Sequence, residues 1–264
     1  MQLTPQVLDD AAAIGEAVAD LIVDRLVAKG TDPFLLGCPS GRTAVPVYAA
    51  LARRARAGQD LSRLVVVMMD DYLIPNDHGG YRIVDQNASY SCLRFAREEI
   101  LRPIADAGRA AGTTPPQEIW TADPETPAHF DTRIEAAGGI DLFLLASGDS
   151  DGHIAFNQPG TDRGARTHLV ELGEATRRDN MGTFPEFTRL DMVPRHGVTV
   201  GVDTIARLSA SAVMILTGAH KQKAFARITA ARAYEPDWPA TIVTECQDAS
   251  ILADACAAGI PARA

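Results

Sequence analysis

Short runs of consecutive apolar residues alternate along this chain with longer segments in which apolar residues recur at helical spacing. The runs predict buried strands at residues 34–38, 64–69, 140–146 and 213–216, with 167–172 also extended. The periodic segments predict helices over residues 9–29, 44–56, 87–104, 130–137, 175–181 and 221–233, and residues 199–208 are expected to pass from a strand end into a short helix.

Alternation of this kind is typical of a parallel sheet that is covered by helices on both faces. The sequence therefore predicts an α/β fold with a doubly wound, mostly parallel, Rossmann-like sheet. The Pro-containing stretch 113–127 is interpreted as a surface connection, because apolar residues resume soon after it. We expect residues 1–264 to form a single domain.

Polar loops follow four of the predicted strands. They contain Ser40, Asp70, Asp151 and Lys221. Ligands of doubly wound folds bind outside the carboxyl ends of the strands, so these loops are predicted to share one site.

Two adjacent carboxylates, Asp70 and Asp71, follow six apolar residues and precede Tyr72. At the rim of a dry sheet the pKa of a carboxyl group rises towards the range useful to a general base. Adjacent side chains point in different directions, so we expect only one of the two to be catalytic. An Asx turn that simply closes the strand is the alternative.

The loop that holds Asp151 and His153 is the strongest candidate for chemistry. A carboxylate beside a histidine fixes its tautomer and raises its basicity, as proton transfer requires. Gly148 and Gly152 are expected to let the backbone approach a ligand. A structural or merely solvated histidine is the alternative.

Ser40-Gly41-Arg42-Thr43 lies between a predicted strand and a predicted helix, where backbone amides and hydroxyls can hold a phosphate. Lys221 and Arg177 are the basic residues expected to help. The alternatives are a capped tight turn for the loop and solvated surface charges for the two basic residues.

The composition limits the kinds of partner that this protein is expected to bind. The formal net charge of −9 and the absence of a basic cluster disfavour a nucleic-acid partner, but they leave room for a small anionic substrate. The N-terminus resembles no secretory signal and no apolar stretch is long enough for a membrane span, so we expect a cytoplasmic protein. The four cysteines are scattered and predict neither a zinc site nor disulfides.

Taken together, these motifs resemble the glucosamine-6-phosphate deaminase and 6-phosphogluconolactonase superfamily over residues 34–230. Residues 69–72 (Met-Asp-Asp-Tyr) are similar to the Met-Asp-Glu-Tyr of the deaminases, and residues 151–157 (Asp-Gly-His-Ile-Ala-Phe-Asn) to their ring-opening loop. A further similar segment is Thr199-Val200-Gly201-Val202. The resemblance implies C2 proton abstraction by Asp70, ring opening by His153 with Asp151, and phosphate contacts at Ser40–Thr43, Arg177 and Lys221.

The chain departs from the deaminase pattern in three places. Gln158 stands where the deaminases carry a Glu that assists ring opening, and an amide cannot accept a proton. If Gln158 slows ring opening, glutamate at this position should raise ammonia release. Residues 78–88 form a longer connection that is expected to reshape the substrate mouth, and His168 and Val170 replace basic effector contacts, so no allosteric control is inferred.

The expected function is therefore isomerisation or deamination of a phosphorylated hexose, in particular an amino-hexose, without metal or organic cofactor. A 6-phosphogluconolactonase-like hydrolase is one alternative, because such an enzyme hydrolyses an ester without a C2 base and the loss of the deaminase Glu moves this chain one step towards it. A non-catalytic sugar-phosphate sensor is the other. The sequence leaves open whether the chain forms a homo-oligomer.

Overall fold

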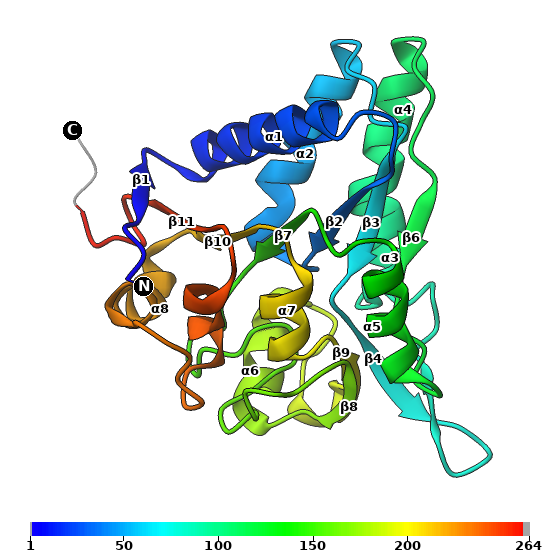
Figure 1. The fold of residues 1–264 in the computed structure, drawn as a ribbon. Helices are drawn as coiled ribbons and strands as arrows, with labels where there is room; N and C mark the ends of the chain where they lie inside the picture. Colours follow the sequence, from blue (N-terminus) through cyan, green and yellow to red (C-terminus); the bar gives the residue numbers. More distant parts are fainter. Residues whose placement is uncertain (1, 261–264) are drawn as a thin grey trace.

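Two sheets form the framework of residues 2–260, the part of the chain that the computed structural model describes (Figure 1). The larger sheet has parallel strands in the order β1-β11-β10-β7-β2-β3-β6, and the smaller is antiparallel in the order β5-β4-β9-β8. The larger sheet consists of β1 (Gln6–Leu8), β2 (Phe34–Cys38), β3 (Leu64–Met68), β6 (Glu118–Trp120), β7 (Leu142–Leu145), β10 (Ala212–Leu216) and β11 (Ala249–Asp254). The smaller sheet consists of β4 (Asp70–Pro75), β5 (Tyr81–Ile83), β8 (His168–Glu171) and β9 (His196–Thr199).

Helices cover both faces of the larger sheet. They are α1 (Ala11–Ala28), α2 (Val45–Arg56), α3 (Cys92–Phe95), α4 (Arg102–Ala110), α5 (Pro127–Ala136), α7 (Val202–Leu208) and α8 (Gln222–Ala230). The remaining helix, α6 (Glu174–Thr183), follows β8 of the smaller sheet. A π-helical segment, Ala96–Leu101, joins α3 to α4. The prediction of a doubly wound α/β fold is confirmed.

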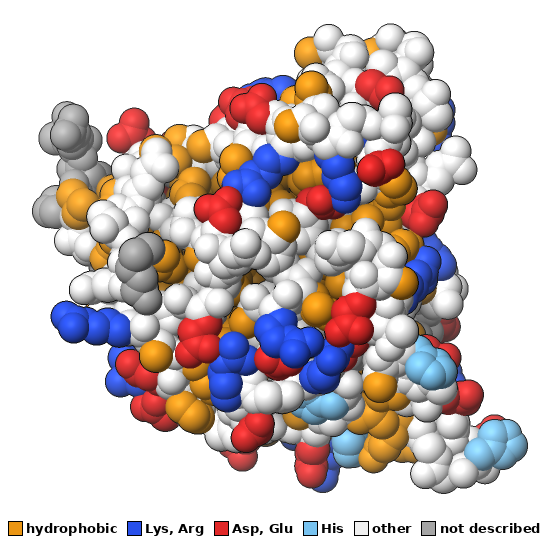
Figure 2. Space-filling model, viewed as in Figure 1, with side chains coloured by type: hydrophobic (Ala, Val, Ile, Leu, Met, Phe, Trp, Pro, Cys, Tyr) orange, Lys and Arg blue, Asp and Glu red, His pale blue; other side chains and the backbone are white. Residues whose placement is uncertain are grey.

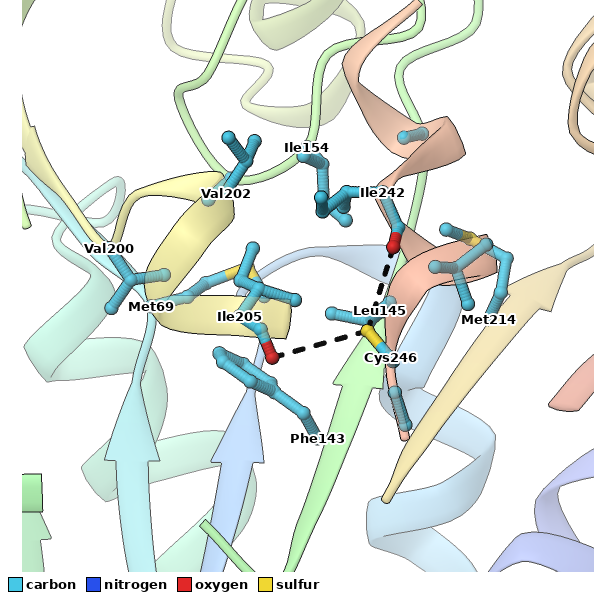
Figure 3. Close-up of a cluster of buried hydrophobic side chains, with 14 of the residues drawn as sticks. Met69, Phe143, Leu145, Ile154, Val200, Val202, Ile205, Met214, Ile242 and Cys246 are labelled. Carbon is cyan, nitrogen blue, oxygen red and sulfur yellow. Dashed lines mark hydrogen bonds between the residues drawn. The ribbon is translucent and has the colours of Figure 1, made fainter. Parts of the chain in front are cut away.

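Alternate residues of the central strands enter two different cores. Leu36 and Leu144 pack on the side of α1, α2 and α4, whereas Leu35 and Leu145 pack on the side of α5, α7 and α8. Figure 3 shows the second core around Phe143 and Leu145. Burial on both faces is the reason that these strands appear in the sequence as unbroken apolar runs.

The second sheet is the main difference from the predicted fold. Asp70 was expected in a loop, but the chain passes from β3 through Met69 directly into β4, where Asp70 pairs with Thr199 of β9. The helix expected over 87–104 begins only at Cys92 and continues to Ala110. Strands β1, β6 and β11 were not predicted. No helix among residues 2–260 combines the length and the apolar character that a membrane span needs.

The surface near α5 and α7 carries paired charges. Arg163 and Arg207 both contact Asp203, and Arg166 contacts Glu135. Figure 2 shows the result on this face, where Lys and Arg side chains are interspersed with Asp and Glu. The positive charges of this network are therefore neutralised locally.

Candidate active site

A cleft of about 300 Å³ opens at the carboxyl ends of β2, β3, β7 and β10. Strands β2 and β7 are parallel neighbours in the sheet although β3 and β6 separate them in the sequence. The order in which successive strands are added to the sheet therefore reverses between them. Such a switch point is where doubly wound folds bind ligands. The predicted site residues that line the cleft are Ser40, Gly41, Arg42, Thr43, Asp70, Gly148, His153 and Lys221.

Asp70 is the buried acid of the cleft. Only 9% of its surface is exposed, because it is the first residue of β4 and lies where the two sheets meet. Burial raises its pKa to about 7, and the neighbouring Asp71 carboxylate adds to this, while the Cys92 thiol and His153 act in the opposite direction. A carboxyl group with such a pKa accepts protons effectively near neutral pH.

Asp71 faces away from the cleft. Its carboxylate accepts hydrogen bonds from the backbone amides of Tyr72, Cys92 and Leu93 at 2.8–3.0 Å. It therefore anchors the beginning of α3 to β4. The structure thus places only one of the two adjacent carboxylates in the cleft, whereas Tyr72 lines it from an aromatic cluster with Tyr90 and Phe156.

His153 and Asp151 form a hydrogen-bonded pair after β7. The ring Nδ1 lies 2.7 Å from Asp151 Oδ1, and the Thr176 hydroxyl donates to Asp151 Oδ2 at 3.0 Å. Burial opposes ionisation of Asp151, but hydrogen bonds from His153 and Thr176 outweigh it and lower its pKa to about 2. An ionised carboxylate only accepts, so Nδ1 carries the hydrogen and Nε2 is left to exchange a proton with a ligand.

Gly148 is required by the shape of this loop. A Cβ atom there would lie 2.2 Å from His153 Nδ1 and 2.7 Å from Asp151 Oδ1. Gly152 has a φ of +70° and lies against the Trp238 ring. The two glycines thus let the loop pack closely around its own side chains, and of the two only Gly148 lines the cleft.

The loop Ser40–Thr43 forms the opposite wall. Gly41 adopts a φ of +100°, and a short 3-10 helix, Arg42–Ala44, then leads into α2. The guanidinium of Arg42 has no hydrogen-bond or ionic partner among residues 2–260. Lys221, by contrast, is buried, pairs with Asp149 and donates to the backbone oxygen of Ser147.

Arg177 was predicted to help hold a phosphate, but its side chain does not line the cleft. Its guanidinium donates to the backbone oxygens of Leu190 and Val193, so it ties α6 to the segment that precedes β9. The position on α6 was predicted, but the direction of the side chain is set by carbonyl groups that lie further along the chain.

Gln158 also lies outside the cleft. Its amide donates to the Glu171 backbone oxygen and accepts from the Gly173 amide, both at 2.6 Å, so it links β8 to the start of α6. It forms no hydrogen bond with His153 in the described chain. The longer connection 78–88 is equally remote, since it forms the β4–β5 hairpin and contributes no residue to the cleft.

Several polar residues of the cleft were missed by the sequence analysis. They are Ser147, Asp149, Asp179, Asn180, Thr183, Thr217 and His220. Asp149 could have been noticed in the loop that also holds Asp151, but α6 supplies three of these residues only because the second sheet folds it over the site. Asp151, His153 and Asp179 offer ligand atoms within 4.8 Å of one another, as a metal site would. Because His153 and Asp151 already bind each other, we interpret them as an acid–base pair.

Fold and site together define an α/β protein whose cleft brings together a buried carboxyl group, a histidine from a hydrogen-bonded His–Asp pair and the glycine-containing loop after β2. The sequence model of the family described as "Glucosamine-6-phosphate isomerases/6-phosphogluconolactonase" matches residues 9–252. The chain belongs to this family. The predicted family resemblance is confirmed.

Curated glucosamine-6-phosphate deaminases and solved structures with either of the two named activities are similar to this chain. Glucosamine-6-phosphate deaminase of Shouchella clausii is 30% identical over 94% of this chain and 93% of its own, and that of Beutenbergia cavernae is 32% identical over 96% and 90%. A solved monomeric glucosamine-6-phosphate deaminase has a TM-score of 0.81 at 22% identity and covers 98% of this chain and 100% of its own. The 6-phosphogluconolactonase of Trypanosoma brucei has a TM-score of 0.67 at 20% identity, with 97% and 98% covered. At these identities the two structures show the shared fold.

Proposed function

We propose that this protein is an isomerase and deaminase of an amino-hexose 6-phosphate. The observation that carries the proposal is Asp70, a buried carboxyl group in the cleft with its pKa raised to about 7. Abstraction of a proton next to a carbonyl carbon needs a base of this kind, whereas hydrolysis of a lactone does not. The deaminase names of the relatives at 30–32% identity support the same reading.

The residues of the cleft suggest a sequence of proton transfers. His153, held by Asp151, moves a proton between the sugar hydroxyl at C1 and the ring oxygen, which opens the ring. Asp70 then takes the proton from C2 and returns it to C1. In the same step the C1 oxygen gains a proton and the C2 nitrogen gives one up, which leaves a hydroxyl at C1 and an imine at C2. Water adds to that carbon, ammonia leaves, and a ketose phosphate remains.

The phosphate is assigned to the loop Ser40–Thr43 with Arg42 and Lys221. The charge of Lys221 is already balanced by Asp149, whereas that of Arg42 has no partner in the described chain. Arg42 is therefore expected to contribute most of the ionic attraction for the phosphate.

Arg42→Gln is expected to raise KM for a phosphorylated amino sugar about 10- to 100-fold, because a hydrogen bond to a charged group is lost. Steady-state kinetics with glucosamine 6-phosphate measure this, and Arg56→Gln, at the far end of α2, serves as the control. An unchanged KM in Arg42→Gln would place the phosphate elsewhere.

Lactone hydrolysis is the second candidate function. It is favoured by the His153–Asp151 pair, which is complete without Asp70. A parallel assay of the purified protein on glucosamine 6-phosphate, galactosamine 6-phosphate and 6-phosphogluconolactone tests both functions. Ammonia release supports the proposal, and acid release without ammonia supports the lactonase.

Gln158→Glu is expected to leave ammonia release within about twofold of the wild-type rate, because the side chain is bound outside the cleft. Its stability should fall by about 0.5–1.5 kcal/mol, since a carboxylate cannot donate to the Glu171 backbone oxygen. Turnover and urea unfolding measure the two effects. A clear gain in ammonia release would instead show that residue 158 acts in ring opening.

A further inference from the structure

The thiol of Cys92 lies directly behind the Asp70 carboxyl group. Sγ donates to Asp70 Oδ1 at 3.4 Å, and only 1% of the Cys92 surface is exposed. The backbone amides of Cys92 and Leu93 meanwhile hold Asp71. The first turn of α3 therefore contacts both carboxylates, but it touches Asp70 through a side chain.

Cys92 also contacts the loop Ser40–Thr43 on the other side of the cleft. Its Sγ lies 3.2 Å from the Ser40 hydroxyl. A thiol has one hydrogen, and because that hydrogen is directed at Asp70, the Ser40 hydroxyl must be the donor in this second contact. Ser40, Cys92 and Asp70 thus form a chain of hydrogen bonds that joins the two walls of the cleft.

The thiol stays protonated throughout the useful pH range. Burial raises the pKa of Cys92 well above its ordinary value, and the carboxylates of Asp71 and Asp70 add to the effect. Cys92 therefore acts as a weak hydrogen-bond donor and not as a nucleophile.

We propose that Cys92 is a positioning residue, whose thiol fixes the Asp70 carboxyl group in the cleft and joins it to the Ser40 hydroxyl. This inference rests on the proposed role of Asp70 as the base. A thiol is a weaker donor than a hydroxyl, so it holds the carboxyl group in place while stabilising its ionised form only a little. The base is thus kept both oriented and strong.

Other charged groups also act on Asp70 and must stay constant in a test. Asp71 lies beside it on β4, and His153 faces it from the loop after β7. The remaining titratable or charged groups that line the cleft are Arg42, Tyr72, Asp149, Asp179, His220 and Lys221. Substitution of Cys92 removes none of these charges.

The test is a ¹³C NMR titration of the Asp70 carboxyl group in the intact protein without substrate, with the signal assigned through Asp70→Asn. Cys92→Ser, which introduces the stronger hydroxyl donor, is expected to lower the pKa of Asp70 by about 0.5–1 unit. Cys92→Ala, which removes the donor, is expected to raise it by a similar amount. The acid limb of kcat/KM for glucosamine 6-phosphate should move in the same direction, and Cys92→Ala should lower kcat several-fold with little change in KM.

Cys246→Ser is the matched control. Cys246 is also a buried thiol, but it contacts only the backbone oxygens of Ile205 and Ile242 in the hydrophobic core (Figure 3). It should leave both the Asp70 titration and the pH profile unchanged. The proposal is overturned if folded Cys92→Ser and Cys92→Ala retain the wild-type Asp70 titration. Shifted titrations in a protein that releases no ammonia would support the positioning role and count against the proposed function alone.

Discussion

Replacement of Asp70 by asparagine is expected to lower kcat for ammonia release by about 10²- to 10⁴-fold, the usual contribution of a general base. The amide has nearly the same shape as the carboxyl group, but it cannot accept the C2 proton. Steady-state turnover of glucosamine 6-phosphate measures the loss. Unchanged turnover would mean that Asp70 is not the base for C2 abstraction and that another group of the cleft takes this proton.

The pH profile gives this prediction a second readout. Asp70 must be ionised to act as a base, and its pKa is raised to about 7. In the wild-type protein kcat/KM is therefore expected to rise with pH through about 7 and then level off. The residual activity of Asp70→Asn should lack this limb.

Stability measurements provide the control for folding. The ordinary pKa of an aspartate, which applies to the unfolded chain, is 3.8, whereas the pKa of Asp70 in the folded protein is about 7. The folded state therefore binds the proton more tightly. The stabilisation is present below about pH 4 and is lost as the pH rises to about 7. Asp70→Asn should thus match the wild type near pH 4 and exceed it at pH 8 by up to about 4 kcal/mol, as measured by urea unfolding. A destabilised variant at pH 8 would contradict the assignment of Asp70 as a buried acid.

The central strands could be predicted because both of their faces are buried. Residues 34–38 and 64–68 are buried at every position and therefore form continuous apolar runs. The edge strands give no such signal. Gln6–Leu8 and Glu118–Trp120 are short and half exposed, and they are held by backbone pairing to one neighbour.

The site could be predicted as far as it depends on the carboxyl ends of the strands. The second sheet could not, because Asp70 pairs with Thr199, a partner distant in the sequence. The same physical reason explains why two predicted site residues, Arg177 and Gln158, lie outside the cleft. The side chains of Arg177 and Gln158 follow backbone groups of later segments, and a local pattern holds no information about those groups.

Replacement of His153 by asparagine is expected to lower kcat by about 10²- to 10⁴-fold on the cyclic substrate, since an amide does not transfer the proton to the ring oxygen. Asparagine retains an N–H group that can donate to Asp151, so the loop should keep its shape. His129→Asn on the exposed surface of α5 is the control for the substitution itself.

A substrate deuterated at C2 separates this loss from that of Asp70→Asn. If His153 opens the ring, ring opening limits the rate in His153→Asn, and the rate ratio of protonated to deuterated substrate should approach one. In Asp70→Asn the C–H bond cleavage limits the rate, so the same ratio should exceed that of the wild type. A large ratio in His153→Asn would show that His153 acts in the C2 step. The assignment of ring opening to His153 and of C2 proton abstraction to Asp70 would then be wrong.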